Sequence, residues 1–433
     1  MANKNTTKNN NSKLSNDSIN SKITAPSIKN TTSKSVNAAN NNSSVSINSS
    51  INSLNSLISN NSSNLNNAIK SSQSPSKSAS LNESSSFKTA KEEAGVYEVV
   101  STNYMLLIGI SAALIIIIII YALSQSFRVG RAVSSMVVYQ GYQQISSLKV
   151  DSTSKFTLGN YHTASAYNAA HSGYQMYDYT SEKVVLSILQ SGARYLEFNV
   201  FNSCFGDKAY PVVSMGYKTG EWKMMINDTP LENIFKIISE NAFTISQGET
   251  GVSNFNDPVI IGLNLNTNSN QSCLNLIAYL IIQYFGTRLL DNKYSFQQND
   301  NIAGIPMQNI VGSDTNGGKV IIFTSDGYQG SGLDEIVNYS WDSGKKLQRI
   351  NNSQIIEPSF NSKGLIEFNK TGMTIVVNHS EGDFLNNNYD PTKALNLGCQ
   401  FVTMEYQYID NNMDIYITNF KNSAFVLKDA KLR

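Results

Sequence analysis

The sequence feature that most restricts how this chain can fold is an apolar run of 20 residues, Tyr104–Leu123, that contains no charged side chain. As an α-helix with a rise of about 1.5 Å per residue, the run would span about 30 Å, which is the hydrocarbon thickness of a bilayer. Tyr104 and Tyr121 lie where aromatic residues gather at membrane interfaces. A buried helix of a soluble core is disfavoured because such helices carry a polar stripe, and between the two tyrosines only Ser111 is polar. The sequence therefore predicts one transmembrane helix at 104–123.

The segment before this run, residues 1–100, is predicted to be a disordered basic tail rich in Asn and Ser. Its first 80 residues contain no aromatic side chain, no Gly and no Cys. A segment of this composition cannot bury enough apolar surface to offset the entropy of ordering. Its lysines could contact anionic lipid or nucleic acid, but no aromatic residue is interleaved for base stacking. A nucleic-acid partner is therefore disfavoured.

The side of the membrane on which the rest of the chain lies is only weakly indicated. Lys88 and Lys91 flank one end of the run, and Arg128 and Arg131 flank the other slightly more closely. The positive-inside rule therefore slightly favours a cytoplasmic globular part and leaves the topology open. The bias toward Asn, Ile, Lys and Tyr is typical of an AT-rich genome, such as that of a giant virus or a protist. A viral protein of this kind would belong in a virion or host membrane.

From about residue 150 onward, short apolar runs alternate with segments of helical periodicity. Strands are predicted at Tyr195–Phe201, Tyr210–Val213, Val259–Leu265, Lys319–Phe323, Met373–Val377 and Phe401–Tyr406, and helices at Ser181–Gln190, Leu231–Ala242 and Leu274–Phe285. This alternation over about 280 residues predicts an α/β fold, a TIM-type (β/α)8 barrel. The expected parts are a juxtamembrane linker at 124–158, half-barrels at 159–323 and 366–433, and a polar connection between the halves at 324–365.

Five short motifs follow one another in a fixed order through this region: Ala169–Tyr174, Gly192–Asn199, Pro211–Gly216, Asn388–Pro391 and Gly398–Gln407. Together they resemble the X and Y half-barrels of the phosphoinositide-specific phospholipase C family, over about residues 160–433. The resemblance implies a phospholipase C-like phosphodiesterase barrel, with its site at the carboxyl ends of the strands.

The resemblance also implies where catalytic groups should lie. Family members use two histidines for acid–base chemistry. The first is retained as His171, whereas the second falls on Met215, and a further frequent histidine falls on Asn266. Methionine cannot transfer protons, so its presence should cost ~10²–10⁴-fold in rate. His379 follows a predicted strand and could form a new pair with His171.

Most ligands of the calcium site that the family uses are also replaced in this sequence. By the resemblance, Glu197 retains one ligand, whereas Ser172, Asn199 and Asn264 replace an Asn, an Asp and a Glu. The ligand charge falls from three negatives to one, and Ca²⁺ prefers several anionic oxygens. Any Ca²⁺ binding is therefore expected to be weak. The three cysteines have no metal-binding spacing, and no other cofactor is expected.

Recognition of a phosphorylated headgroup is expected to be weak as well. Phe323 and Ser325 stand where the family has two phosphate-binding lysines, and no Arg or Lys occurs in 376–383. Tyr389, in Asn388–Pro391, is retained and could stack on a sugar ring. A polyanionic inositol phosphate would therefore find few cationic partners.

These observations leave two hypotheses for function. The first is a membrane-anchored phospholipase C-like barrel that is catalytically inactive and serves as a binding or structural module, with a lipid headgroup or a protein at its mouth. The second is a divergent phosphodiesterase that uses His171, Glu197 and His379 with weak or no calcium dependence. Met215 and Asn264 favour the first hypothesis, that of a pseudoenzyme.

Overall fold

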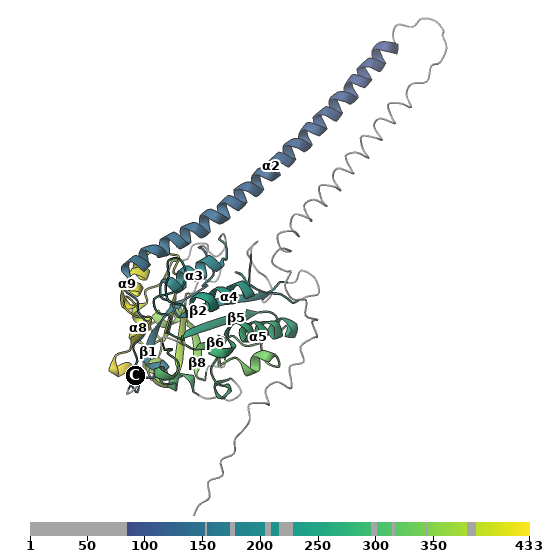
Figure 1. The fold of residues 1–433 in the computed structure, drawn as a ribbon. Helices are drawn as coiled ribbons and strands as arrows, with labels where there is room; N and C mark the ends of the chain where they lie inside the picture. The colour runs from purple at the N-terminus through teal and green to yellow at the C-terminus, as the bar shows by residue number, and fades with distance from the viewer. Residues whose placement is uncertain are drawn as a thin grey trace, which may run out of the picture. The chain divides into compact units, whose positions relative to one another are not determined.

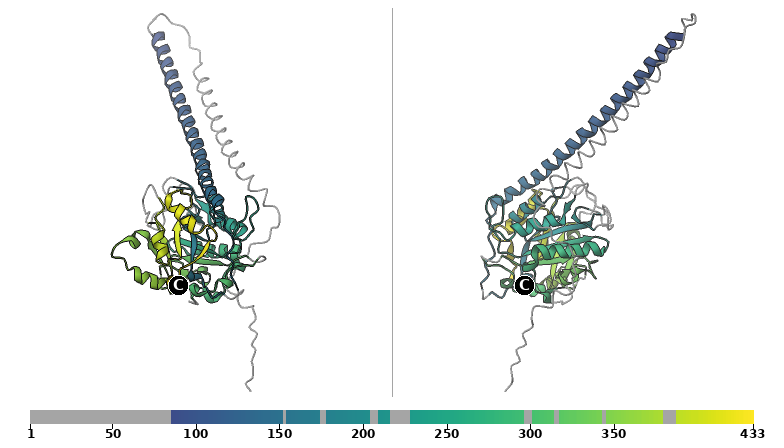
Figure 2. Two further views of the ribbon diagram at one scale, coloured as in Figure 1. Left: turned by 90° about the vertical axis from the view of Figure 1, so that its left-hand side faces the viewer. Right: turned by 45° about the vertical axis from the view of Figure 1, so that its right-hand side comes forward.

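The computed structural model describes residues 85–151, 154–173, 178–203, 209–215, 228–295, 301–313, 317–342, 345–378 and 387–433 (Figures 1 and 2). The first 84 positions of the expected tail and His379 lie outside the described residues. The chain divides into two compact units, residues 1–102 and 103–433, and the barrel belongs to the second.

The first described element is a long helix, α2, at Ser85–Tyr142, which begins within the expected tail and ends within the expected linker. Residues 85–100 are helical rather than disordered, which their content of Ala, Lys and Glu explains, since all three favour helices. In the described part of the chain, one helical stretch, Tyr104–Tyr142, is long and apolar enough to cross a membrane, and an 18-residue window within it has a mean hydropathy of 3.0. The large apolar side chains between Tyr104 and Ile120 are exposed.

The last turns of α2 differ from the apolar run because they pack on the barrel. Ala132, Met136 and Tyr139 are buried, and their spacing of four and three places them on one side of the helix. The Ser135 hydroxyl donates to the Gln407 carbonyl at 3.1 Å, and the Tyr139 hydroxyl donates to the Tyr408 carbonyl at 3.2 Å. This end of α2 lies beside the barrel (Figures 1 and 2) and contributes to its core.

Eight parallel strands form the barrel, and each pairs with neighbours in chain order. They are β1 Tyr161–Ala166, β2 Tyr195–Asn202, β5 Val259–Asn266, β6 Val320–Thr324, β7 Tyr339–Ser340, β8 Leu347–Asn351, β9 Met373–Val377 and β10 Phe401–Met404. The hydrogen-bonded path runs from β7 round to β8 and so nearly closes. The prediction of a TIM-type barrel is confirmed.

Shorter strands extend the barrel at two places. β3 (Pro211–Val213) pairs antiparallel with β2 and with β4 (Thr229–Pro230). β11 (Phe425–Leu427) pairs antiparallel with β1.

Helices connect the strands. They are α3 Glu182–Gln190, α4 Leu231–Asn241, α5 Gln271–Phe285, α6 Asn352–Ile356, α7 Ser362–Thr371, α8 Thr392–Asn396 and α9 Asn411–Asn419. Local sequence sets their starts: the Ser181 side chain accepts from the Lys183 amide at the beginning of α3, and Asn270 does the same for α5. Short 3₁₀ turns lie at Leu158–Asn160, Gly286–Arg288, Asn292–Tyr294, Ile302–Gly304, Met307–Asn309, Gly332–Glu335 and Ala430–Leu432.

Residues 324–365, expected from their polarity to form a surface connection, supply the two strands at which the barrel nearly closes. β7 has two residues, and four of the five residues of β8 are only partly buried. Neither strand therefore contains the continuous apolar run by which a buried strand is recognised in sequence.

An aromatic layer fills the interior of the barrel below its carboxyl end. The Tyr195 ring lies 4.9 Å from that of Phe401 and 6.5 Å from that of Phe323, and Phe323 stacks on Tyr339 at 6.1 Å. Position 262 must be glycine, since a Cβ there would lie 2.5 Å from the Tyr195 hydroxyl. This layer forms the floor of the site described next.

Candidate functional site

The residues predicted for the site gather at the carboxyl end of the barrel, although their partners differ from those expected of a catalytic centre. Glu197 and Asn199 lie on β2, and Asn199 is directly opposite Asn264 on β5. His171 follows β1, and Met215 follows β3. The parallel strands thus bring these groups to one end of the barrel, as expected for the fold.

Glu197 is held by an arginine that the sequence analysis did not single out. Arg349, on β8, places its Nη2 atom 2.8 Å from the Glu197 Oε1 atom, and the Tyr195 hydroxyl donates to Oε2 at 2.9 Å. The Glu197 side chain is only 2% exposed. Burial acts to lower the pKa of Arg349 and is the largest single influence on it, but the charge and hydrogen bond of Glu197, with Tyr167 and Tyr195, together outweigh burial and raise that pKa. The guanidinium therefore stays charged and neutralises the one carboxylate retained from the expected calcium site.

The same guanidinium lies among aromatic rings. Its Cζ atom is 5.7 Å from the centroid of the Trp341 ring and 6.0 Å from that of Tyr167. These contacts are within the range of cation–π attraction. They hold the Arg349 side chain in place within the barrel.

Three asparagines form a hydrogen-bonded chain beside this ion pair. The Asn264 amide donates to the Asn199 side-chain oxygen at 2.7 Å, and the Asn199 amide donates to that of Asn168, also at 2.7 Å. Asn168 has a φ of 46°, a left-handed conformation that Asn tolerates better than most residues. The side-chain oxygen of Asn199 thus already accepts a hydrogen bond from within the protein. Among the described residues, no group of three or more His, Cys, Asp or Glu side chains could hold a metal ion.

His171 is buried and in contact with the backbone. Its Nδ1 atom lies 2.6 Å from the Gly173 carbonyl oxygen, which can only accept, so Nδ1 carries a proton. Burial lowers the pKa of His171 to about 4, against the opposite influence of the Gly173 carbonyl and Asp178. The imidazole is therefore neutral at pH 7. Beside it, the Ser172 hydroxyl accepts from the Tyr179 amide at 3.1 Å.

Met215 lies in a small apolar cluster. It is 6% exposed and packs with Tyr179, and Tyr121 and Val129 of α2 pack against the pair. The Tyr121 and Tyr179 rings meet edge to face at 5.6 Å. The position at which a second acid–base group was expected is therefore apolar and lies beneath α2.

Comparison with known families gives a match to two domain models. Residues 154–311 match the X domain of phosphatidylinositol-specific phospholipase C, and residues 336–431 match its Y domain. Together the two matches cover more than half of the chain. This chain belongs to the phosphatidylinositol-specific phospholipase C family.

Solved structures agree with this fold. PLC21 from S. officinalis aligns with a TM-score of 0.51 and PLC21 from L. pealei with 0.50, each at 19% identity. Each alignment covers 64% of this chain and 38% of the other, so this chain spans less than half the length of either protein. At this identity the likeness concerns the fold alone. No curated protein matches the chain significantly.

Within this phospholipase C-like barrel, the positions expected to recognise a headgroup are also engaged internally. Phe323 belongs to the aromatic layer, and the Ser325 hydroxyl accepts from the Leu265 amide at 2.8 Å. The Tyr389 hydroxyl donates to the Val376 carbonyl at 3.0 Å. Burial raises the pKa of Tyr389 well above its usual value, so the hydroxyl stays protonated.

A second group missed in the sequence is Glu405, which follows β10 at the same end of the barrel. It is 1% exposed, and the Gln407 amide donates to its Oε2 atom at 3.3 Å. Burial, assisted by Asp410, raises the pKa of Glu405 to about 8. This carboxyl is therefore mostly protonated at neutral pH and adds little negative charge to the site. Glu405 lies near the end of the predicted strand Phe401–Tyr406, and a carboxyl at that place was the signal available in the sequence.

Proposed function

We propose that this chain is a membrane-anchored phospholipase C-like barrel that has lost catalysis and serves as a binding or structural module. The observation that carries the proposal is the ion pair between Glu197 and Arg349. The one anionic ligand retained from the expected calcium site is already neutralised by a side chain of the same barrel.

Charge and geometry together argue against tight calcium binding. A Ca²⁺ ion would have to compete with the Arg349 guanidinium for Glu197, and breaking a buried ion pair leaves an uncompensated charge. Asn199 and Asn264 are hydrogen-bonded to one another and offer neutral oxygens where Ca²⁺ prefers carboxylates. We therefore expect neither calcium nor another cofactor to be required.

The position at which the family has its second acid–base group holds a methionine. Phosphodiester cleavage requires one group that accepts a proton and another that donates one. Met215 cannot do either, and His171 is neutral at pH 7 with its Nδ1 proton directed at a backbone carbonyl. Of the two catalytic positions that the resemblance implies, only that of His171 therefore retains a group that can transfer a proton.

Anchoring rests on the apolar run Tyr104–Leu123, which would cross the bilayer once. The charges that flank the run slightly favour a cytoplasmic barrel. If the source is viral, the membrane would be that of the virion or the host. The partners that we propose are the bilayer itself and a lipid headgroup or protein at the barrel mouth.

One observation favours the alternative, a divergent phosphodiesterase. Glu405 is a second titratable group at the same end of the barrel as His171, and its pKa of about 8 lies near neutrality. A protonated carboxyl of this kind can act as a general acid. Glu405 would then take the part assigned above to His379.

The test is an assay of the full chain in nanodiscs with phosphatidylinositol, its bisphosphate and a glycerophosphodiester, each with and without Ca²⁺. We expect no turnover, while a bacterial phospholipase C in the same discs cleaves its substrate. Turnover that disappears in both His171→Ala and Glu405→Gln would overturn the proposal and establish the alternative. Thermal unfolding of each variant verifies that the barrel is folded.

A further inference from the structure

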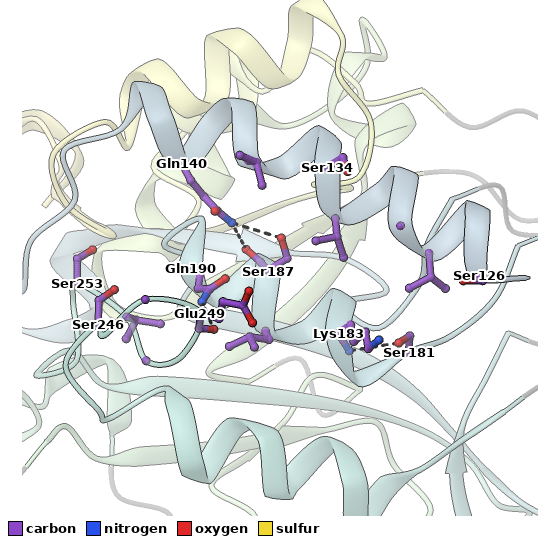
Figure 3. A pocket seen from close by; sticks show the side chains of 18 of the residues that line it. Ser126, Ser134, Gln140, Ser181, Lys183, Ser187, Gln190, Ser246, Glu249 and Ser253 are labelled. Atoms are coloured by element: carbon purple, nitrogen blue, oxygen red, sulfur yellow. Dashed lines mark hydrogen bonds between the residues drawn. The ribbon is translucent and has the colours of Figure 1, made fainter.

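A groove of about 1040 Å³ separates α2 from α3 and from the loop 246–253 (Figure 3). It begins beside Ala122, at the end of the apolar run, and continues along α2 as far as Gln140. The groove therefore opens at the level where a bilayer would end. It is separate from the barrel interior, and of its lining residues Val129 alone belongs to the site described above, where it packs against Met215 and Tyr179.

The two walls of the groove are fixed at both ends. At the end near the apolar run, the Arg128 Nη1 atom lies 2.7 Å from the Asp178 Oδ1 atom, and Tyr121 packs on Tyr179. At the other end, the Gln140 amide donates to the Ser187 carbonyl at 3.1 Å (Figure 3). Because α2 is attached on either side of the gap, the groove is a built feature of the fold.

The walls are rich in hydroxyl and amide groups and carry almost no net charge. Six serines and three glutamines line the groove, with Lys183 and Glu249 as its charged residues. Hydroxyls and amides both donate and accept hydrogen bonds. Gln140, Ser187, Ser181 and Gln190 already form hydrogen bonds within the protein. A purely hydrocarbon ligand would bury the other hydroxyls and amides without partners, and a polyphosphate would find only one cation. The walls therefore fit an uncharged, polyhydroxylated ligand.

An apolar strip runs along the same groove. Val129, Val133 and Val137 line it from α2, and Leu186 lines it from α3. A sugar ring presents hydroxyls at its edge and C–H groups on its faces, so the strip and the polar groups can be contacted together. Small-molecule sites typically combine an apolar lining with a few such polar groups.

We propose that this groove binds the uncharged sugar headgroup of a membrane glycolipid. The inference rests on the anchoring proposed above. A lipid whose acyl chains lie in the same layer as Tyr104–Leu123 has its headgroup just beyond Leu123, at the level of Ser126. Because protein and lipid share one membrane, the effective concentration of the headgroup at the groove is high. Weak contacts with the walls are then sufficient for occupancy.

The test uses the full chain in phosphatidylcholine nanodiscs, with and without monogalactosyl diacylglycerol. We expect the galactolipid to slow amide exchange in 181–190 and 246–253 on the order of tenfold, since occupancy reduces local opening. Phosphatidylinositol bisphosphate in place of the galactolipid, and free galactose in solution, should leave exchange unchanged.

Two tryptophan variants of α2 locate the effect. Ser126→Trp fills the membrane end of the groove from an exposed position and should abolish the protection by the galactolipid. Val138→Trp is the matched control: it lies on the same helix, is 61% exposed and does not line the groove, so protection should persist. Gly130→Phe is a second blocking variant, since a Cβ at that position meets no atom within 4 Å.

Other results would overturn the proposal. Equal protection by bisphosphate lipid or by free galactose, or protection that survives in both blocking variants, would contradict a glycolipid site. A chain that enters the nanodisc but shows no response to the galactolipid refutes this inference and leaves the anchoring intact. A chain that fails to enter the nanodisc refutes the anchoring as well.

Discussion

Two neighbouring layers inside the barrel achieve stability in different ways. In the lower layer, Tyr195, Phe323 and Phe401 fill the interior through ring contacts. In the layer above, Glu197 pairs with Arg349, and Asn199 pairs with Asn264. A site that binds metal or substrate needs polar groups left available for the ligand. In the upper layer these groups instead pair with one another, so the fold of the family is kept while polar groups at its carboxyl end are used within the protein.

The largest effect is expected from Phe323→Ala in the lower layer. Phe323 is fully buried and contacts rings from three other strands. Truncation should reduce the free energy of unfolding by about 3–5 kcal/mol, as for other buried phenylalanines. Urea unfolding of the full chain in detergent measures the change. A loss below about 1 kcal/mol would mean that the aromatic floor is not a packed core.

A somewhat smaller loss is expected from Arg349→Met in the upper layer. The substitution leaves Glu197 charged and buried without its partner, which should cost about 3 kcal/mol in the free energy of unfolding. Adding Glu197→Gln removes the orphaned charge and should recover most of that loss. No polar substitution should rescue Phe323→Ala in this way, which is the difference between the two layers.

Added calcium tests whether the ion pair between Glu197 and Arg349 leaves Glu197 available to a metal ion. Millimolar Ca²⁺ should leave the thermal midpoint of the unaltered chain unchanged, because Arg349 already neutralises Glu197. A midpoint that rises with Ca²⁺ in the unaltered chain would contradict the internal pairing, and EDTA should then reverse the rise.

A pH dependence is expected from Glu405, at the carboxyl end of the barrel. Its pKa in the folded chain, about 8, is raised above the usual 4.5, so the folded state holds this proton more tightly than the unfolded state. The stability that comes from this tighter proton binding is fully present below about pH 4.5 and is lost as the pH rises toward 8. Glu405→Gln, which cannot ionise, should therefore lose less stability than the unaltered chain between pH 5 and about 8. Parallel slopes for the two proteins would show that Glu405 is ionised in the fold.

Much of the barrel could be predicted from sequence because buried strands such as Val259–Leu265 are continuous apolar runs. β7 could not, since it has only two residues, and β8 could not, since four of its five residues are only partly buried. That Glu197, Asn199 and Asn264 lie close together could also be predicted, because the carboxyl ends of parallel strands meet at one end of a barrel. Arg349 could not be foreseen, because a charged residue in a half-buried strand resembles a surface charge until its partner on β2 is known. The burial that raises the pKa of Glu405 likewise depends on residues distant in sequence.

The unbroken course of α2 from the apolar run into the barrel core has a mechanical consequence. Ala132, Met136 and Tyr139 join the helix to the barrel without an intervening flexible hinge. If the run spans a bilayer, a change in bilayer thickness that tilts the helix also tilts the barrel, since a helix adjusts to thickness by tilting. The barrel would then present a different side to the membrane surface in thin and in thick bilayers.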